Sequence, residues 1–170
     1  QMALRTSRRW ISALHLTLGL ALAATAALAQ QATIAFGELK QDTTLPVEVA
    51  AETFSVNNAD GTALFSGDVR VIQGEMTLAA AEVRVEYDPT GKAISRLLAT
   101  GGVTITSLGD AAAAAEAVYT LDSGTIVLTG DVLLTQGPSA MSGQKLTLNL
   151  KDGTGVMEGR VTTTFVPGAN

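Results

Sequence analysis

A short unit that contains a Gly-x-Val step recurs along this chain and constrains its fold more than any other feature. The steps are Gly67-Asp68-Val69, Gly101-Gly102-Val103, Gly130-Asp131-Val132 and Gly159-Arg160-Val161. A shift of 63 residues places the first step on the third, and it also places Val83, Val85 and Tyr87 on Leu146, Leu148 and Leu150. Internal repetition of this kind predicts equivalent units that stack in layers around one continuous apolar interior.

Alternation of apolar and polar residues dominates the sequence after Pro46 and predicts strands with one solvent-exposed face and one buried face. Clear examples are Val69/Val71, Val83/Val85/Tyr87, Val103/Ile105 and Leu146/Leu148/Leu150. Turn-forming sequences separate these runs at residues 57–61, 88–91, 122–124 and 151–153. Short strands at this spacing predict an all-β sandwich, barrel or roll.

The glycines of the Gly-x-Val steps are predicted to mark β-bulges or bends where a strand turns a corner, in preference to a binding role. The alanine-rich segment 110–117 has helix propensity. The repeat nevertheless aligns Ala115-Glu116 with Ala51-Glu52, which stands just before a predicted strand. We therefore predict a loop over residues 110–114 and a strand over residues 117–121. The uneven spacing of the steps favours hairpins over solenoid coils.

Residues 1–29 have the features of a cleavable export signal. Arg5, Arg8 and Arg9 form a basic region, residues 11–26 form a mostly apolar one, and Ala27-Leu28-Ala29 is an A-x-A cleavage motif. A retained membrane anchor is the alternative, but the apolar stretch is short and polar residues interrupt it. We predict a flexible lead-in or loosely held edge segment over residues 30–45, one β domain over residues 46–166 and a tail over residues 167–170.

Removal of this signal also changes the chemistry available to the chain. The only Trp and the only His lie within residues 1–29, and the sequence has no Cys. Thiol chemistry, Ser-His-Asp triads and His-based metal sites are therefore excluded from the mature chain. Three of the eleven basic residues leave and all sixteen acidic residues stay, so eight positive charges face sixteen negative ones and the net charge is −8. Nucleic acid is not expected as a partner of such an acidic chain.

Two carboxylates occupy equivalent repeat positions and are the remaining candidates for catalysis. Asp68 and Asp131 each follow a glycine of the Gly-x-Val step. Aspartates beside bend glycines commonly serve turn hydrogen bonds, whereas glycosidase chemistry needs two carboxylates at a set separation. We therefore predict that the chain is not an enzyme and that it uses no cofactor.

The repeat pattern resembles that of the LptA/OstA family. The resemblance is carried by Ala51-Glu52, Gly67-Asp68-Val69, Gly102-Val103, Gly130-Asp131-Val132 and Leu146-Thr147-Leu148, and it extends roughly from residue 46 to residue 164. It implies a slightly twisted, open β-jellyroll of stacked antiparallel hairpins. It also implies a periplasmic bridge protein that moves lipopolysaccharide from the inner to the outer membrane, with the acyl chains in the apolar interior.

A lipid carrier needs a long apolar trough, because each buried methylene contributes about 0.8 kcal/mol. The inward alternates, together with two methionines that adapt to irregular space, are the candidate lipid-binding residues. They are Phe54, Val56, Phe65, Val69, Val71, Met76, Val83, Val85, Tyr87, Val103, Ile105, Ile126, Leu128, Met141, Leu146 and Leu148. The alternation by itself favours a closed core made of these residues, and only the resemblance to the family favours a lipid-lined interior.

The family resemblance also implies the partners. These are lipopolysaccharide, the inner-membrane-anchored and outer-membrane Lpt components, which would pair with sheet edges, and further copies of the chain joined head to tail. Segments 47–51 and 161–165 carry few charges and are candidate edge strands for such pairing. Candidate phosphate contacts are Arg70, Arg84, Arg96, Lys145 and Arg160, for which an ordinary solvated face is the alternative. The alternative function is a structural or scaffold β-repeat protein of the cell envelope without lipid cargo.

Overall fold

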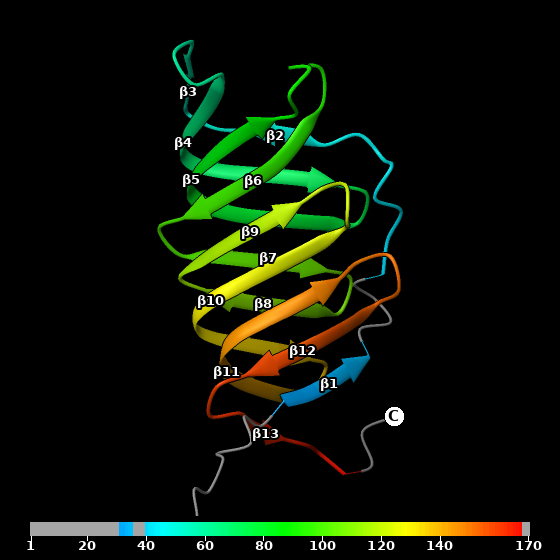
Figure 1. Cartoon of the computed structure of the whole chain (residues 1–170). Coiled ribbons are helices and arrows are strands. Elements are labelled where there is room, and N and C mark those ends of the chain that lie inside the picture. The colour runs from blue at the N-terminus through cyan, green and yellow to red at the C-terminus, as the bar shows by residue number, and fades with distance from the viewer. Residues whose placement is uncertain (1–30, 36–39, 168–170) are drawn as a thin grey trace, which may run out of the picture.

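A computed structural model describes residues 31–35 and 40–167, and in these residues it contains β-strands and no helix (Figure 1). The strands are β1 (Gln31–Ala35), β2 (Glu48–Ala50), β3 (Thr53–Asn57), β4 (Thr62–Gln73), β5 (Met76–Tyr87), β6 (Ile94–Thr100), β7 (Val103–Ser107), β8 (Asp110–Ala114), β9 (Glu116–Thr120), β10 (Thr125–Gln136), β11 (Ser139–Asn149), β12 (Thr154–Glu158) and β13 (Thr162–Thr164). The prediction of an all-β fold is confirmed. The described part of the chain therefore has no helix long and apolar enough to cross a membrane.

All the strand pairs are antiparallel, and the sheet folds over on itself into two layers. The first layer runs in the order β3, β4, β5, β6, β9, β10, β11, β12, β1. The second layer runs in the order β2, β4, β5, β7, β8, β10, β11, β13. The long strands β4, β5, β10 and β11 contribute one half to each layer. This arrangement is a roll of stacked hairpins with a strongly tilted ladder of strands (Figure 1).

The Gly-x-Val steps are the corners at which the chain passes between the layers, as predicted. The pairing register shifts between Ser66 and Val69 in β4 and between Thr129 and Val132 in β10. Gly67, Gly101, Gly130 and Gly159, with φ angles of 84°, 81°, 85° and 83°, lie at corners along one side of the roll, and we call this row the glycine spine. Backbone hydrogen bonds link neighbouring corners, for example from Ala115 N to Gly130 O at 3.0 Å.

The alanine-rich segment corrects one prediction. Residues 110–114 were predicted to form a loop, but Asp110–Ala114 is strand β8, which pairs with β7 on one side and with β10 on the other. Strand pairing on both sides outweighs the weak helix propensity of alanine, and small side chains suit a strand in the middle of a layer. Strand β9 spans Glu116–Thr120, close to the predicted strand over residues 117–121.

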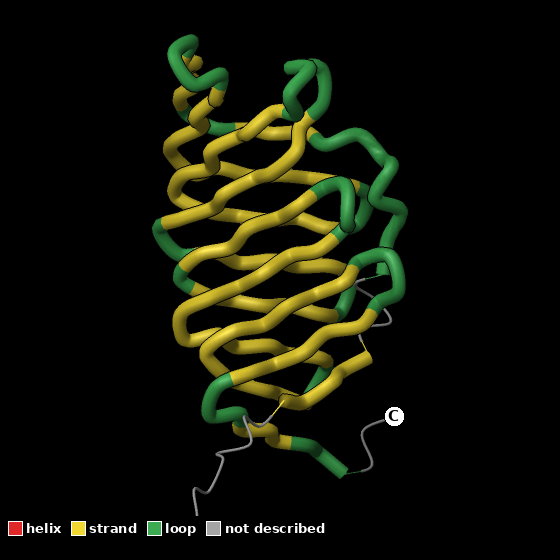
Figure 2. The backbone as a smooth tube through the Cα atoms, viewed as in Figure 1, coloured by secondary structure: helices red, strands yellow, loops and turns green. Residues whose placement is uncertain are grey.

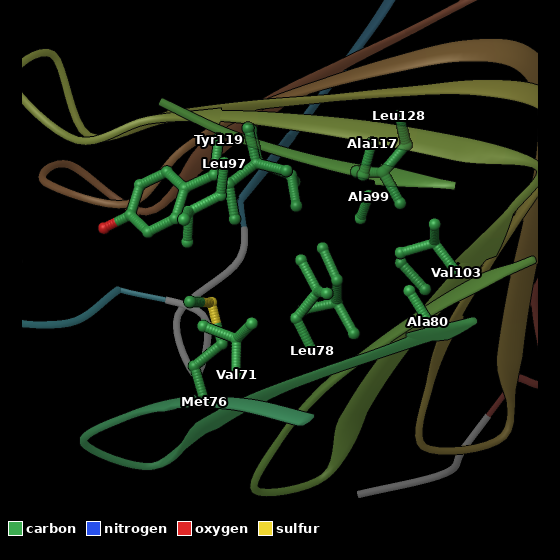
Figure 3. Packing of buried hydrophobic residues seen from close by; sticks show 14 of the residues in the cluster. Val71, Met76, Leu78, Ala80, Leu97, Ala99, Val103, Ala117, Tyr119 and Leu128 are labelled. Atoms are coloured by element: carbon green, nitrogen blue, oxygen red, sulfur yellow. The ribbon is translucent and has the colours of Figure 1, made fainter. Parts of the chain in front are cut away.

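The core lies between the two layers and consists of the inward alternates of both. In β7 and β12, for instance, buried and more exposed residues alternate along the whole strand. The largest fully buried side chains include Tyr119, Met76, Leu97 and Leu128, and Figure 3 shows residues of both layers facing each other across this interior. Since each apolar side chain buried in this way contributes about 1.5–3 kcal/mol, the interior supplies most of the stabilisation of the roll.

A long loop runs along the side of the roll opposite the glycine spine (Figure 2). It consists of residues 40–47, and we call it the lateral strap. β1 before it pairs with β12 at one end of the roll, and β2 after it pairs with β4 at the other end. β1 is therefore an edge strand, whereas the predicted signal segment lies outside the described residues.

Candidate functional site

The interior brings together most of the side chains that the sequence analysis singled out for lipid binding. Eleven of the sixteen are at most 2 % exposed and belong to one continuous cluster. They are Val69, Val71, Met76, Val83, Val85, Val103, Ile105, Ile126, Leu128, Leu146 and Leu148. Phe65 and Met141 are partly buried and pack against this cluster. The arrangement is one cluster of mostly apolar side chains between the two layers.

Three of the predicted residues are not enclosed. Phe54 and Val56 are each 57 % exposed, and Tyr87 is 41 % exposed. Phe54 is the register partner of Phe65, and the two rings lie 4.8 Å apart between centroids. In the described part of the chain β3 pairs only with β4, so this end of the first layer has few neighbours to cover it. The expectation of enclosure is wrong for these three residues, whereas their contact with lipid stays a prediction.

An apolar pocket of about 220 Å³ opens at the other end of the roll. It is lined by Ile34, Leu134, Gln136, Ser139, Ala140, Met141, Thr163 and Phe165, which come from β1, from the β10–β11 hairpin and from the region of β13. Of these, only Met141 was predicted. Leu134 could have been found, because the 63-residue shift places Val71 on it. Ile34 and Phe165 gave no such signal, since both lie outside the repeated units.

The lateral side of the roll carries the buried polar residues. Gln73, Ser107 and Asp110 are 0 %, 2 % and 7 % exposed, and all three lie at the ends of second-layer strands. Tyr119 Oη donates a 2.7 Å hydrogen bond to Gln73 Oε1. Burial raises the pKa of Tyr119 to about 12. The interior therefore changes from apolar to polar toward the lateral strap.

The candidate phosphate contacts lie on the outside of the roll. Arg70 is 3.7 Å from Asp68, Arg96 is 2.7 Å from Glu86, and Lys145 is 3.6 Å from Glu158. These three cations thus face carboxylates of the same protein across exposed surface, where such pairs contribute at most about 1 kcal/mol. Arg84 and Arg160 are also exposed. The structure therefore places these five basic residues on the solvated surface and does not gather them into one cluster.

Residues 48–154 match the family described as LptA/(LptD N-terminal domain) LPS transport protein. The chain belongs to this family. Membership confirms the predicted resemblance and agrees with the prediction that the chain is not an enzyme, because the family consists of transport proteins.

Two relatives extend the comparison. A protein of Rhizobium meliloti (strain 1021), named uncharacterized protein R00383, is 28 % identical over 118 residues, which are 65 % of this chain and 63 % of that protein. The chain thus spans less than two thirds of the length of this relative. LptH of Pseudomonas aeruginosa, the LptA homologous periplasmic component of a lipopolysaccharide transport device, has the same fold with a TM-score of 0.66. It is 18 % identical, and the match covers 74 % of this chain and 99 % of LptH. The likeness to LptH confirms the predicted jellyroll.

Proposed function

We propose that this chain is a periplasmic carrier that binds lipopolysaccharide by its acyl chains in the interior between the two layers and passes it from the inner toward the outer membrane. The observation that carries the proposal is the continuous apolar interior, which reaches exposed apolar residues at one end and an apolar pocket at the other. A single acyl chain of a dozen carbons gains on the order of 10 kcal/mol from such an environment. Membership of the lipopolysaccharide transport family supports the same proposal.

The proposal includes partners at the sheet edges. Among the described residues, β2 and β3 pair only with β4, while β1 pairs only with β12 and β13 only with β11. Each of these strands therefore presents one row of unpaired backbone groups, which is the surface that β-augmentation uses. We assign these edges to inner-membrane-anchored and outer-membrane Lpt components and to further copies of the chain. Domain limits at residues 46 and 166 and export by a cleaved signal over residues 1–29 belong to the same proposal.

The experiment that tests lipid binding compares a photoreactive amino acid at three positions, in the presence of purified rough lipopolysaccharide. Val85 is 1 % exposed, its neighbour Arg84 is exposed on the outer face of the same strand, and Phe54 lies at the uncovered end. Phe54 accepts a photoreactive phenylalanine derivative without disturbing the core. We expect lipopolysaccharide adducts at Val85 and Phe54 and none at Arg84.

Two results would contradict the proposal. Equal adduct formation at Arg84 would indicate adsorption to the outer surface. A lack of adducts at all three positions, in variants whose circular dichroism shows a folded β protein, would favour a scaffold protein of the cell envelope without lipid cargo.

A further inference from the structure

The lateral strap joins the two layers on the side opposite the glycine spine (Figure 1). Toward the first layer, Gln41 N donates to Leu150 O at 3.0 Å. Toward the second layer, Gln73 Nε2 donates to Thr43 O at 3.1 Å and to Leu45 O at 2.9 Å. In the described part of the chain no strand pairing crosses from one layer to the other on this side. The strap is therefore a backbone connection between these two borders of the interior, and the side-chain hydrogen bond from Tyr119 to Gln73 adds to it.

Gln73 is the residue on which this connection depends. Its amide nitrogen donates to the two strap carbonyls, and its amide oxygen accepts from Tyr119 Oη at 2.7 Å and from Gln41 Nε2 at 3.2 Å. Both hydrogens of the amide group and both lone pairs of its oxygen are thus used. Because Gln73 is fully buried, this set of bonds makes the polar group compatible with its position next to the apolar core.

The strap is held by hydrogen bonds more than by apolar burial. Only Val47 of the strap packs against the core, while Leu45 is 41 % exposed. The Oε1 atom of Gln41 is buried and accepts no hydrogen bond from the described residues, so its environment is less favourable than water. A segment attached in this way opens locally at a much lower free energy than the sheet that it covers.

We propose that the lateral strap controls access to the interior: while Gln73 binds Thr43 and Leu45 the two layers stay joined, and an acyl chain enters from the side only after these hydrogen bonds break. In the closed form described here, buried side chains of both layers face each other (Figure 3) and form one core cluster, so a lipid needs the layers to separate. This inference rests on the proposed function for the nature of the cargo, but the movement of the strap is measurable without lipid.

The first experiment fixes the strap in place. Leu45 and Ile72 are both partly exposed and line the same shallow surface pocket, and the sequence contains no Cys. In the double variant Leu45→Cys/Ile72→Cys, a short thiol-reactive crosslinker joins the strap to β4 and so keeps strap position 45 next to Gln73. The control is Thr77→Cys/Thr106→Cys, two register partners on neighbouring second-layer strands. We expect lipopolysaccharide loading at least tenfold slower for the first crosslinked pair than for the control, and equal rates for the two would overturn the proposal.

The second experiment needs no lipid. Met76 is 1 % exposed, and its sulfur lies 4.0 Å from Gln41 Nε2 of the strap. In Met76→Cys, the rate of maleimide labelling reports how often the strap opens. Adding Gln73→Met removes both hydrogen bonds to the strap carbonyls and is expected to raise this rate about 30-fold, because each ordinary hydrogen bond contributes a factor of about five. Adding Gln144→Met makes the same chemical change at the glycine spine and should leave the rate unchanged.

The two experiments separate failure of the inference from failure of the proposed function. If the uncrosslinked protein does not bind lipopolysaccharide, the proposed function fails, and the labelling rate of Met76→Cys still decides whether the strap controls access. An unchanged rate in the Gln73→Met background would overturn the inference. So would an equal rise at Val103→Cys, a buried position beside the glycine spine, because that result would indicate general unfolding.

Discussion

Two glycines with the same backbone conformation provide a quantitative test of the corner packing. Gly102 and Gly130 both have a φ of 85°. A Cβ atom on Gly102 would have no atom within 4 Å, whereas a Cβ on Gly130 would lie 2.7 Å from the Cβ of Ala115. Substitution by alanine therefore separates the cost of the backbone conformation from the cost of the contact between corners.

The expected magnitudes follow from these two terms. An alanine at this φ lowers the free energy of unfolding by about 1–2 kcal/mol. Alanine also reduces the conformational entropy of the unfolded chain, which offsets about 0.4–1 kcal/mol of this loss. Gly102→Ala is thus expected to lower the free energy of unfolding by about 1 kcal/mol. Gly130→Ala adds the overlap with Ala115, and overpacking of this kind costs about 1–3 kcal/mol. Its total cost should be about 2–4 kcal/mol.

Urea unfolding followed by circular dichroism measures both variants, and a double-mutant cycle identifies the contact. Ala115→Gly removes the methyl group that the new side chain at position 130 would meet. In the Gly130→Ala background this second substitution should therefore restore at least about 1 kcal/mol relative to its effect in the unsubstituted protein. Equal losses for Gly102→Ala and Gly130→Ala, or additive effects in the cycle, would refute the view that close approach of the corners selects glycine along the spine.

Two further predictions concern the interior. The pKa of Tyr119 in the folded protein, about 12, lies above the ordinary value of 10, so the unfolded state loses the phenol proton first as the pH rises. About 2 kcal/mol of the free energy of unfolding should therefore disappear between pH 10 and pH 12. Urea unfolding at both pH values should show a smaller loss for Tyr119→Phe. Leu128→Ala should lower the free energy of unfolding by about 2–5 kcal/mol because Leu128 is fully buried. Phe54→Ala should lower it by less than about 1 kcal/mol because Phe54 is exposed. Similar losses for the two variants in thermal unfolding would contradict an uncovered end at β3.

The corners and the strand interiors were predictable because both depend on local chemistry. Alternation such as Val103/Ile105 reflects the two faces of a strand, and a Gly-Asp pair before a valine permits the left-handed conformation that Gly67 and Asp68 adopt. The alanines of β8 were not predictable, because their pairing with β7 and β10 depends on strands distant in the sequence.

The lateral strap was beyond sequence reasoning for a different reason. Its residues show no alternation, and its hydrogen bonds reach Gln73 and Leu150, which lie far along the chain. The partner of Gln73 inside the roll, Tyr119, is 46 residues away. The uncovered position of Phe54 likewise depends on which strands end a layer, and alternation identifies the inward face of a strand without indicating whether anything lies opposite.

The glycine spine gives this fold a modular length. The close approach at each spine glycine is to a neighbouring corner, as at Gly130 and Ala115, so a duplicated unit of 63 residues could be inserted between two corners and repeat the same local junction. Gene duplication could therefore extend the apolar interior in whole increments, and the distance that a single protomer covers would be set by the number of units it inherits.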